Sequence, residues 1–317
     1  EISGAVAAVQ AGTPVVLVGD RAKLEPEATR LAGGRLPDGL TFVHAPEIIS
    51  MEDEPSRAVR RKKNASMVRA FDLVKSGEAD AVVTCGNSGA AMVLGTLVLG
   101  RIAGVDRPAI AQHIPHHRGM NVMLDAGATV DCKPEWLLQF GHIGAAYART
   151  VLEIPDPRVG LLANGTEDGK GNAAVQAAHL LFKAGTPFTY AGLAEPMDFF
   201  RGDIDVGVMD GFAGNLILKT IEGVAESIFG FLKMEIAARP LAMAGAMLAK
   251  PAFAAVKKRA DFEAHGAAPL LGVDGAAFIG HGRSSHRAVL NAILAARRYV
   301  ERGAIQQITR SFAPPAA

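Results

Sequence analysis

Five polar, glycine-containing segments hold most of the side chains that could do chemistry. Each follows a short apolar run that is predicted to be a strand, and they occupy residues 86–90, 125–128, 164–172, 210–215 and 280–284. In a parallel sheet the carboxyl ends of the strands share one edge, where open α/β folds bind ligands. Glycines allow the backbone to approach a ligand closely, and the N–H groups that begin the following helices attract anions. The pattern favours a site for phosphate or for an oxyanion.

Several familiar catalytic signatures do not fit this sequence. Residues 165–171 resemble a P-loop, but Gly171 stands where that motif needs a magnesium-binding Ser or Thr. The first predicted strand is not followed by G-x-G-x-x-G, which leaves a dinucleotide site unsupported. His113, His116 and His117 lie among prolines, and we interpret them as a solvated loop rather than a metal site. Cys132 precedes Lys133 and a predicted helix start, yet a packed thiol is favoured over a nucleophile.

Composition narrows the class of protein. The chain has 317 residues, 49% of them hydrophobic, and a net charge of +1, so a large core is available and nucleic-acid binding is not expected. Two cysteines cannot form a disulfide framework and fit a reducing compartment. The first residues lack the pattern of a signal peptide, and we expect a cytoplasmic enzyme. Residues 81–100 carry no charge, but the polar turn at 86–89 predicts a buried strand, a loop and a helix instead of a membrane span.

The elements that must position these segments alternate between strand and helix. Strands are predicted at residues 14–18, 81–84, 108–112, 121–124, 159–163, 205–209 and 276–279. Helices are predicted at residues 64–74, 134–152, 172–184, 212–236 and 285–302. Short unalternating apolar strands are typical of a sheet that is covered on both faces. The sequence therefore predicts a three-layer α/β/α fold with a mostly parallel sheet.

Two further segments are unusual. Arg57, Arg60, Arg61, Lys62 and Lys63 form a basic cluster, which is either a solvated helix face or a site for phosphate or an acidic protein. Residues 239–259 are apolar and flanked by cations, but too short to span a bilayer. They fit a buried hairpin or dimer contact, or a hydrophobic tip that settles on an anionic membrane surface.

Taken together, these segments resemble a known family, the bacterial phosphate acyltransferases of phospholipid synthesis. The matching runs are RRKKN at 60–64, ADAVV at 79–83, GNSGA at 86–90, DRP at 106–108, VDCKP at 130–134, residues 203–215 and GAAPLLG at 266–272. Ser88 stands where the family commonly has Thr, which preserves the hydroxyl group. The family normally begins with a strand and an Asp-Ala-Met-Gly-Gly-Asp-like loop. This sequence starts after them, so we expect a single domain over 1–317 without that strand and loop.

The resemblance implies an enzyme that moves a long acyl group from acyl carrier protein to inorganic phosphate, without a cofactor or a metal. The product would be an acyl phosphate, which a membrane glycerol-3-phosphate acyltransferase consumes. The family is homodimeric, cytoplasmic and peripherally associated with the membrane. Its fold is similar to that of isocitrate and isopropylmalate dehydrogenases. A phosphate acetyltransferase-like enzyme that uses coenzyme A, and an inactive membrane-associated scaffold, remain as alternatives.

Phosphate is itself a nucleophile, so such an enzyme needs anion binding and oxyanion stabilisation instead of a Ser or Cys nucleophile. We assign phosphate binding to Gly86, Asn87, Ser88 and Gly89, with Lys170 and Asn172 facing them. Asp210 and Asn215 are expected to orient donors or the thioester, and His281 is the candidate for proton transfer. Docking of the carrier protein is assigned to Arg60, Arg61, Lys62 and Lys63. A protruding helical segment at about 238–262 is expected to touch the membrane through Leu241, Met247, Leu248 and Phe253.

Overall fold

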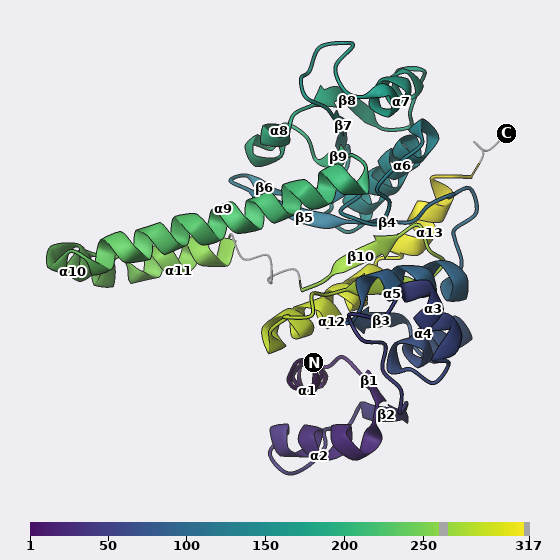
Figure 1. The fold of residues 1–317 in the computed structure, drawn as a ribbon, viewed down its shortest axis with the longest axis vertical. Coiled ribbons are helices and arrows are strands. Elements are labelled where there is room, and N and C mark those ends of the chain that lie inside the picture. Colours follow the sequence, from purple (N-terminus) through teal and green to yellow (C-terminus); the bar gives the residue numbers. More distant parts are fainter. Residues whose placement is uncertain (260–265, 314–317) are drawn as a thin grey trace.

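The computed structural model describes residues 1–259 and 266–313, which form an α/β fold of mostly parallel strands (Figure 1). One small sheet pairs β1 (Val15–Gly19) with β2 (Leu40–His44). A second sheet has the order β3 (Ala81–Thr84), β11 (Ala276–Ile279), β10 (Ala268–Leu271) and β4 (Ala109–Ile110). The third sheet has the order β5 (Gln112–His116), β6 (Gly119–Leu124), β9 (Val206–Val208), β7 (Arg158–Leu162) and β8 (Thr189–Ala194).

Helices alternate with these strands and cover the sheets. In chain order they are α1 (Ile2–Gln10), α2 (Arg21–Leu31), α3 (Pro55–Arg61), α4 (Ser66–Ser76), α5 (Ser88–Leu94), α6 (Pro134–Thr150), α7 (Ala173–Lys183), α8 (Pro196–Arg201), α9 (Gly211–Ala237), α10 (Pro240–Leu248), α11 (Lys250–Arg259), α12 (His286–Glu301) and α13 (Ala304–Arg310), and a π-helical turn, η1 (Gly95–Leu99), directly follows α5. In the second sheet, α4 and α12 pack on β3; in the third, α6 packs on β6, β7 and β9.

The second and third sheets are joined where β4 passes into β5. Ala111, between these strands, donates its N–H to the Pro269 carbonyl of β10 at 3.0 Å. Ala126, after β6, donates to the Ile110 carbonyl of β4 at 2.9 Å. The core is continuous with this junction, since Val122, Val206 and Leu271 belong to one buried cluster. The loops at the ends of both sheets are therefore held on a common frame.

A helical arm leaves this body (Figure 1). We use the name helical arm for the outer part of α9 with α10 and α11. Within α9 only Gly211 and Gly214, at its first turn, are buried, and α10 buries no residue. Pro240 and Pro251 stand near the starts of α10 and α11, where a missing N–H is harmless. The helical arm is thus longer than the predicted protruding segment at 238–262, because it includes the outer part of α9. Residues 260–262 lie outside the described residues.

The α/β class with mostly parallel strands is confirmed, whereas one interpretation is wrong. His117 is exposed in a turn, but His113, Pro115 and His116 do not form a solvated loop. They lie in β5, which pairs antiparallel with β6, and His113 is buried with its Nε2 atom 3.0 Å from the Tyr147 hydroxyl. In the described part of the chain, no helix combines the length and the apolar character that crossing a membrane requires.

Candidate active site

The first group of predicted site residues lies at the carboxyl ends of β3 and β11, which are parallel neighbours. Gly280 donates its N–H to the Thr84 carbonyl at 2.7 Å, which ties the two strand ends together. His281 is exposed in the following turn, where its carbonyl accepts the N–H of Ser284 at 2.8 Å. The structure thus brings the segments 84–89 and 280–284 together at the carboxyl ends of two parallel strands.

Asn87 organises this place through four hydrogen bonds of its side chain. Its Oδ1 accepts the N–H of Ala90 at 2.9 Å and caps α5. Its Nδ2 lies 3.0, 3.4 and 3.2 Å from the carbonyl oxygens of Ser50, Met51 and Asp53. The side chain is buried and occupied within the protein, so Asn87 shapes the loop and orders the segment that leads into α3.

The basic helix α3 packs beside this loop. A Cβ on Gly89 would come within 2.7 Å of Pro55 in the first turn of α3, so only glycine permits this approach. Lys62, which follows α3, binds the Asp53 carboxylate at 2.5 Å and the Ile48 carbonyl at 2.9 Å. This hydrogen bond from Lys62, followed by the N–H of Ser50, lowers the pKa of Asp53.

The other members of the basic cluster differ from Lys62. Arg57, Arg60, Arg61 and Lys63 are exposed. None of these four forms an ion pair with another residue of the described ranges 1–259 and 266–313. Four cations on or just after α3 are therefore without an ion-pair partner among the described residues, while the fifth, Lys62, holds the loop.

A second group joins the ends of β6 and β9, which are also parallel neighbours. Asp125 accepts N–H groups from Ile110 at 2.9 Å, Gly127 at 3.2 Å, Ala128 at 3.0 Å and Thr129 at 2.6 Å. Burial of this carboxyl group raises its pKa to about 6, while the four donors oppose that shift. The sequence analysis included Asp125 in the segment 125–128 but gave it no role of its own, although its position directly after a parallel strand is a signal of function.

The start of α9 is fitted tightly against the Asp125 loop. A Cβ on Gly214 would overlap the Asp125 carbonyl oxygen, so glycine is required there. Asp210 caps α9 by accepting the N–H of Ala213 at 2.7 Å. Asn215 is exposed on the first turns of α9, beside Gly127. Asp210 and Asn215 are thus placed together at this strand edge.

Cys132 also lies near this group, and its thiol is packed. Its Sγ atom lies 3.6 Å from the Thr129 carbonyl, and burial raises its pKa to about 12. The interpretation of Cys132 as a packed thiol agrees with this environment, because a thiol with a raised pKa is a poor nucleophile.

The loop 164–172 after β7 carries Lys170 and Asn172. Asn172 caps α7 by accepting the N–H of Val175 at 2.9 Å, and Asn164 accepts the N–H of Gly171 at 2.8 Å. The stem of Lys170 lies over Gly165, and its ammonium group forms no ion pair with a described residue. Lys170 is therefore available to an anionic ligand.

A clamp behind Lys170 holds this loop to α7 and β8. Asp168 accepts hydrogen bonds from Lys183 at 2.8 Å and pairs with His179 Nε2 at 3.0 Å, and both partners lower the pKa of Asp168. The Nδ1 atom of His179 lies 2.7 Å from the Tyr190 hydroxyl. Sequence reasoning missed this clamp because its members are separated along the chain.

The predicted residues are thus assembled in three places, not in one contact network. Among the described residues, no hydrogen bond or ion pair links the 84–89 and 280–284 pair, the 125–129 and 210–215 pair, and the 164–172 loop with one another. The last two places share the third sheet, where β9 lies between β6 and β7. Each place offers helix N-termini or cations to an anion, which is the chemistry that phosphate binding requires. In the described ranges, no cluster of three or more His, Cys, Asp or Glu side chains could hold a metal ion.

The fold is similar to that of solved phosphotransacetylases. A phosphotransacetylase from Streptococcus pyogenes superposes with a TM-score of 0.57 over 96% of this chain and 91% of its own, at 15% identity. The EutD phosphotransacetylase from Staphylococcus aureus gives a TM-score of 0.55 over 94% and 92%, at 16% identity. At these identities the similarity establishes the fold alone.

The sequence comparisons identify the family. The model of the fatty acid synthesis protein family matches residues 2–307. A protein of Pelotomaculum thermopropionicum named phosphate acyltransferase is 49% identical over 98% of this chain and 90% of its own length. One of the same name from Geobacter sulfurreducens is 47% identical over 98% and 90%. The chain belongs to this family, and it is an enzyme of the phosphate acyltransferase type that acts in fatty acid and phospholipid synthesis.

Proposed function

We propose that this enzyme transfers a long acyl group from the thioester of acyl carrier protein to inorganic phosphate. A phosphate oxygen attacks the thioester carbonyl carbon and forms a tetrahedral oxyanion. The carbon–sulfur bond then breaks, the acyl phosphate leaves, and the carrier-protein thiolate takes up a proton. The reaction needs no nucleophilic side chain, and backbone donors with a few cations supply the stabilisation.

The observation that carries this proposal is the juxtaposition of the 86–89 loop and the basic helix α3. The N–H groups of Ser88 and Gly89 begin α5 and have no acceptor among the described residues. Four cations of the basic cluster lie on or just after α3, whose first turn packs on Gly89, and none has a carboxylate partner in the described chain. A region with free donors and excess positive charge is suited to a small anion such as phosphate and to an acidic protein surface.

We assign roles to the remaining candidate residues according to their positions in the structure. Lys170 stands on a clamped loop with a free ammonium group, and we assign it to phosphate or to the developing oxyanion. Asn172 and Asp210 cap helices and so hold donors in place, while Asn215 is exposed and can meet the thioester. His281, exposed at the end of β11, is assigned to protonation of the leaving thiolate.

Delivery of the product is the second part of the proposal. The acidic carrier protein would dock on Arg60, Arg61 and Lys63, whereas Lys62 maintains the loop beneath them. The tip of the helical arm would contact the bilayer through Leu241, Met247 and Leu248, which are exposed. There the acyl phosphate would pass to a membrane glycerol-3-phosphate acyltransferase. We further propose that the enzyme acts as a homodimer, as the family resemblance implies.

The test is release of carrier-protein thiol from palmitoyl-acyl carrier protein, with and without inorganic phosphate, with mass spectrometry of the acyl product. We expect release that depends on phosphate and yields one equivalent of acyl phosphate. Acetyl-CoA, run as the competing donor, should support much slower turnover. Phosphate-dependent turnover of acetyl-CoA with no turnover of the carrier-protein thioester would contradict the proposed donor.

A further inference from the structure

Gln176 on α7 binds the backbone on both sides of Lys170. Its Nε2 atom donates to the Gly169 carbonyl at 2.7 Å and to the Gly171 carbonyl at 3.2 Å. One side-chain amide therefore ties the residue before Lys170 and the residue after it to the helix that follows the loop. This tether holds the backbone of Lys170 in a fixed position relative to α7.

The loop around Lys170 needs such a tether, because it has no regular secondary structure. Gly169 and Gly171 have φ values of 94° and 88°, in the left-handed region that favours glycine. They let the chain turn on each side of Lys170, and the Lys170 N–H donates to the Glu167 carbonyl at 3.1 Å within the turn. Bonds inside so short a loop fix its shape but not its place on the molecule, which the tether to α7 sets.

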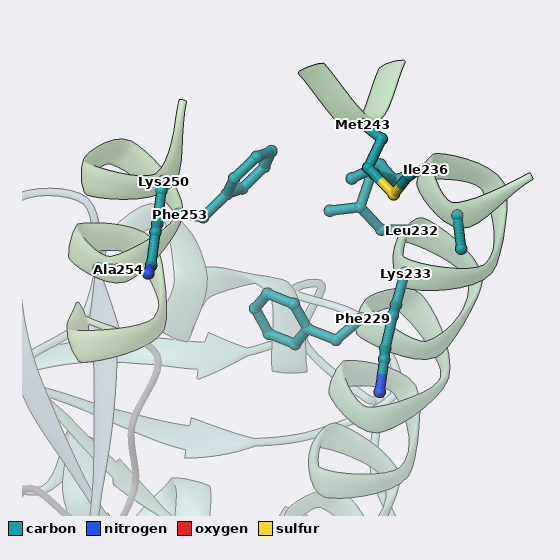
Figure 2. Close-up of a pocket in the computed structure, with 9 residues that line it drawn as sticks. Phe229, Leu232, Lys233, Ile236, Met243, Lys250, Phe253 and Ala254 are labelled. Carbon is teal, nitrogen blue, oxygen red and sulfur yellow. The ribbon is translucent and has the colours of Figure 1, made fainter. Parts of the chain in front are cut away.

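Lys233 and Lys250 show the more common way in which a lysine is held. They lie on α9 and α11 of the helical arm, on the two sides of the space between these helices (Figure 2). Within a helix, backbone hydrogen bonds between successive turns fix the point from which a side chain starts. Lys170 starts from a loop, so side-chain hydrogen bonds must fix that point instead.

The base of the same loop is held by the clamp around Asp168. Each carboxylate oxygen of Asp168 accepts a hydrogen bond from Lys183 Nζ at 2.8 Å. An ionised carboxylate can only accept, so His179 Nε2, at 3.0 Å from it, donates. In the neutral imidazole the other nitrogen, Nδ1, then accepts the hydroxyl proton of Tyr190 at 2.7 Å. This chain of hydrogen bonds joins the loop to α7 and β8.

The stem of Lys170 has a defined place as well. A Cβ on Gly165 would come within 3.0 Å of the Cγ atom and 3.1 Å of the Cδ atom of Lys170, so Gly165 leaves the room that this stem occupies. Gly165 is buried, whereas Lys170 is partly exposed. A lysine whose backbone and stem are already ordered loses less conformational entropy when it binds an anion.

We propose that Gln176 is a positioning residue for Lys170. Its amide holds the backbone of the lysine so that the ammonium group meets phosphate, and the Asp168 clamp fixes the base of the same loop. This role rests on the proposed function, which assigns Lys170 to phosphate or to the developing oxyanion. Gln176 acts through Lys170 and not on the ligand, because its amide donates to the two carbonyl groups of the loop.

The test is Gln176→Met, which keeps the length of the side chain and removes its donors. We expect kcat/KM for phosphate to fall by about three- to tenfold, because a neutral hydrogen bond contributes modestly. The KM for the carrier-protein thioester should stay within about twofold of the parent. Asp168→Ala, which opens the clamp, should also lower kcat/KM for phosphate. Gln307→Met, at an exposed glutamine of α13, is the matched control and should leave both parameters unchanged.

A second set of variants shows whether Gln176 acts through Lys170. In the Lys170→Ala background, adding Gln176→Met should lower kcat/KM for phosphate by less than about twofold, because the group that it positions is gone. Urea unfolding of Gln176→Met should be close to that of the parent, since Gln176 is exposed. The full loss on adding Gln176→Met to Lys170→Ala would overturn the proposal, because Gln176 would then act independently of Lys170.

Acetylation of lysines by sulfosuccinimidyl acetate, followed by peptide mass spectrometry, tests the phosphate contact without turnover. Inorganic phosphate should slow acetylation of Lys170 in the parent by at least about threefold, and Gln176→Met should lose most of this protection. Lys23 on α2 should react at the same rate with and without phosphate in both proteins. Equal protection of Lys170 in the parent and in Gln176→Met would contradict the positioning role.

The same measurements separate this role from the proposed function. Phosphate-dependent thiol release by the parent, together with equal protection of Lys170 in both proteins, removes the positioning role alone. If Lys170 is protected in a way that depends on Gln176 but the parent releases no carrier-protein thiol, the proposed reaction is wrong. Lys170 and Gln176 would then remain parts of an anion site.

Discussion

Asp125 is the buried carboxyl group on which the second group of site residues depends. Its two oxygens accept four backbone N–H groups from β4 and from the loop after β6. Burial raises its pKa to about 6, above its ordinary value of 3.8, so the folded protein binds this proton more tightly than the unfolded chain. The bound proton therefore adds its full contribution to the free energy of unfolding at pH values below the ordinary pKa. This contribution declines as the pH rises toward about 6, and above that pH it is lost.

For Asp125→Asn we predict a changed pH dependence of unfolding. The free energy of unfolding of the parent should lose up to about 3 kcal/mol between pH 4 and pH 7 through this residue, whereas the variant should lack that component. The variant should also be less stable at both pH values, because the new amide faces the Thr129 N–H. Urea unfolding at the two pH values measures both effects, and parallel pH profiles for the two proteins would refute the assignment.

Lys170 is the residue whose free ammonium group meets the anion in our proposal. Lys170→Ala should raise the KM for phosphate or lower kcat, with a combined loss on the order of 10²-fold in kcat/KM. Lys23→Ala, at an exposed lysine of α2, the helix that packs on the small sheet of β1 and β2, is the control and should leave kcat/KM unchanged. Near-normal, saturable phosphate kinetics in Lys170→Ala would remove Lys170 from the site.

At the scale of elements, the basic residues on and just after α3 fall into two kinds, one that holds a loop and one that is exposed without an ion-pair partner in the described part of the chain. Lys62 is paired with Asp53, whereas Arg60 and Arg61 lie on the exposed side of the cluster. Free surface cations act mainly on the association rate of an acidic partner, and salt screens their effect.

We therefore predict that Arg60→Gln/Arg61→Gln flattens the dependence of the KM for acyl carrier protein on salt concentration. The KM at low salt should rise by roughly three- to tenfold, with kcat preserved. Arg35→Gln/Arg310→Gln removes the same charge from exposed positions outside the cluster and should keep the slope of the parent. Identical slopes in all three proteins would exclude α3 as the docking element.

The strands and loops also show how much of the structure can be predicted from the sequence alone. The strands at 81–84 and 276–279 were predicted with their exact bounds, since each is a short apolar run ended by a small or polar residue. β2, β5, β8 and β10 were missed. β2, β5 and β8 are sheet-edge strands of mixed character, and β10 contains Pro269. The site loops could be found from glycines after strands. The clamp of His179, Asp168 and Lys183 could not, because it depends on how α7 packs against β8.

At the scale of the whole molecule, the helical arm carries its tip away from the loops (Figure 1). The site that we propose for turnover and the membrane contact that we propose therefore lie on separate parts of one chain. A tip that inserts apolar side chains gains about 1–2 kcal/mol for each large side chain that leaves water.

The variant Leu241→Ser/Met247→Ser/Leu248→Ser should lower sedimentation with anionic vesicles by at least about tenfold. Turnover of a soluble carrier-protein thioester should stay within twofold of the parent, because the tip is remote from the loops. Leu97→Ser, at an exposed leucine of the body, is the control. Undiminished vesicle binding by the folded tip variant would place the membrane contact elsewhere.

The strand order of the second sheet also has a consequence for synthesis on the ribosome. β10 and β11, from residues 268–279, lie between β3 and β4, from residues 81–110. The third sheet uses only residues 112–208, so it can form while the chain is still being made. The early strands β3 and β4 must wait unpaired until the last part of the chain emerges, and during that interval their apolar edges are open to chaperones or to aggregation.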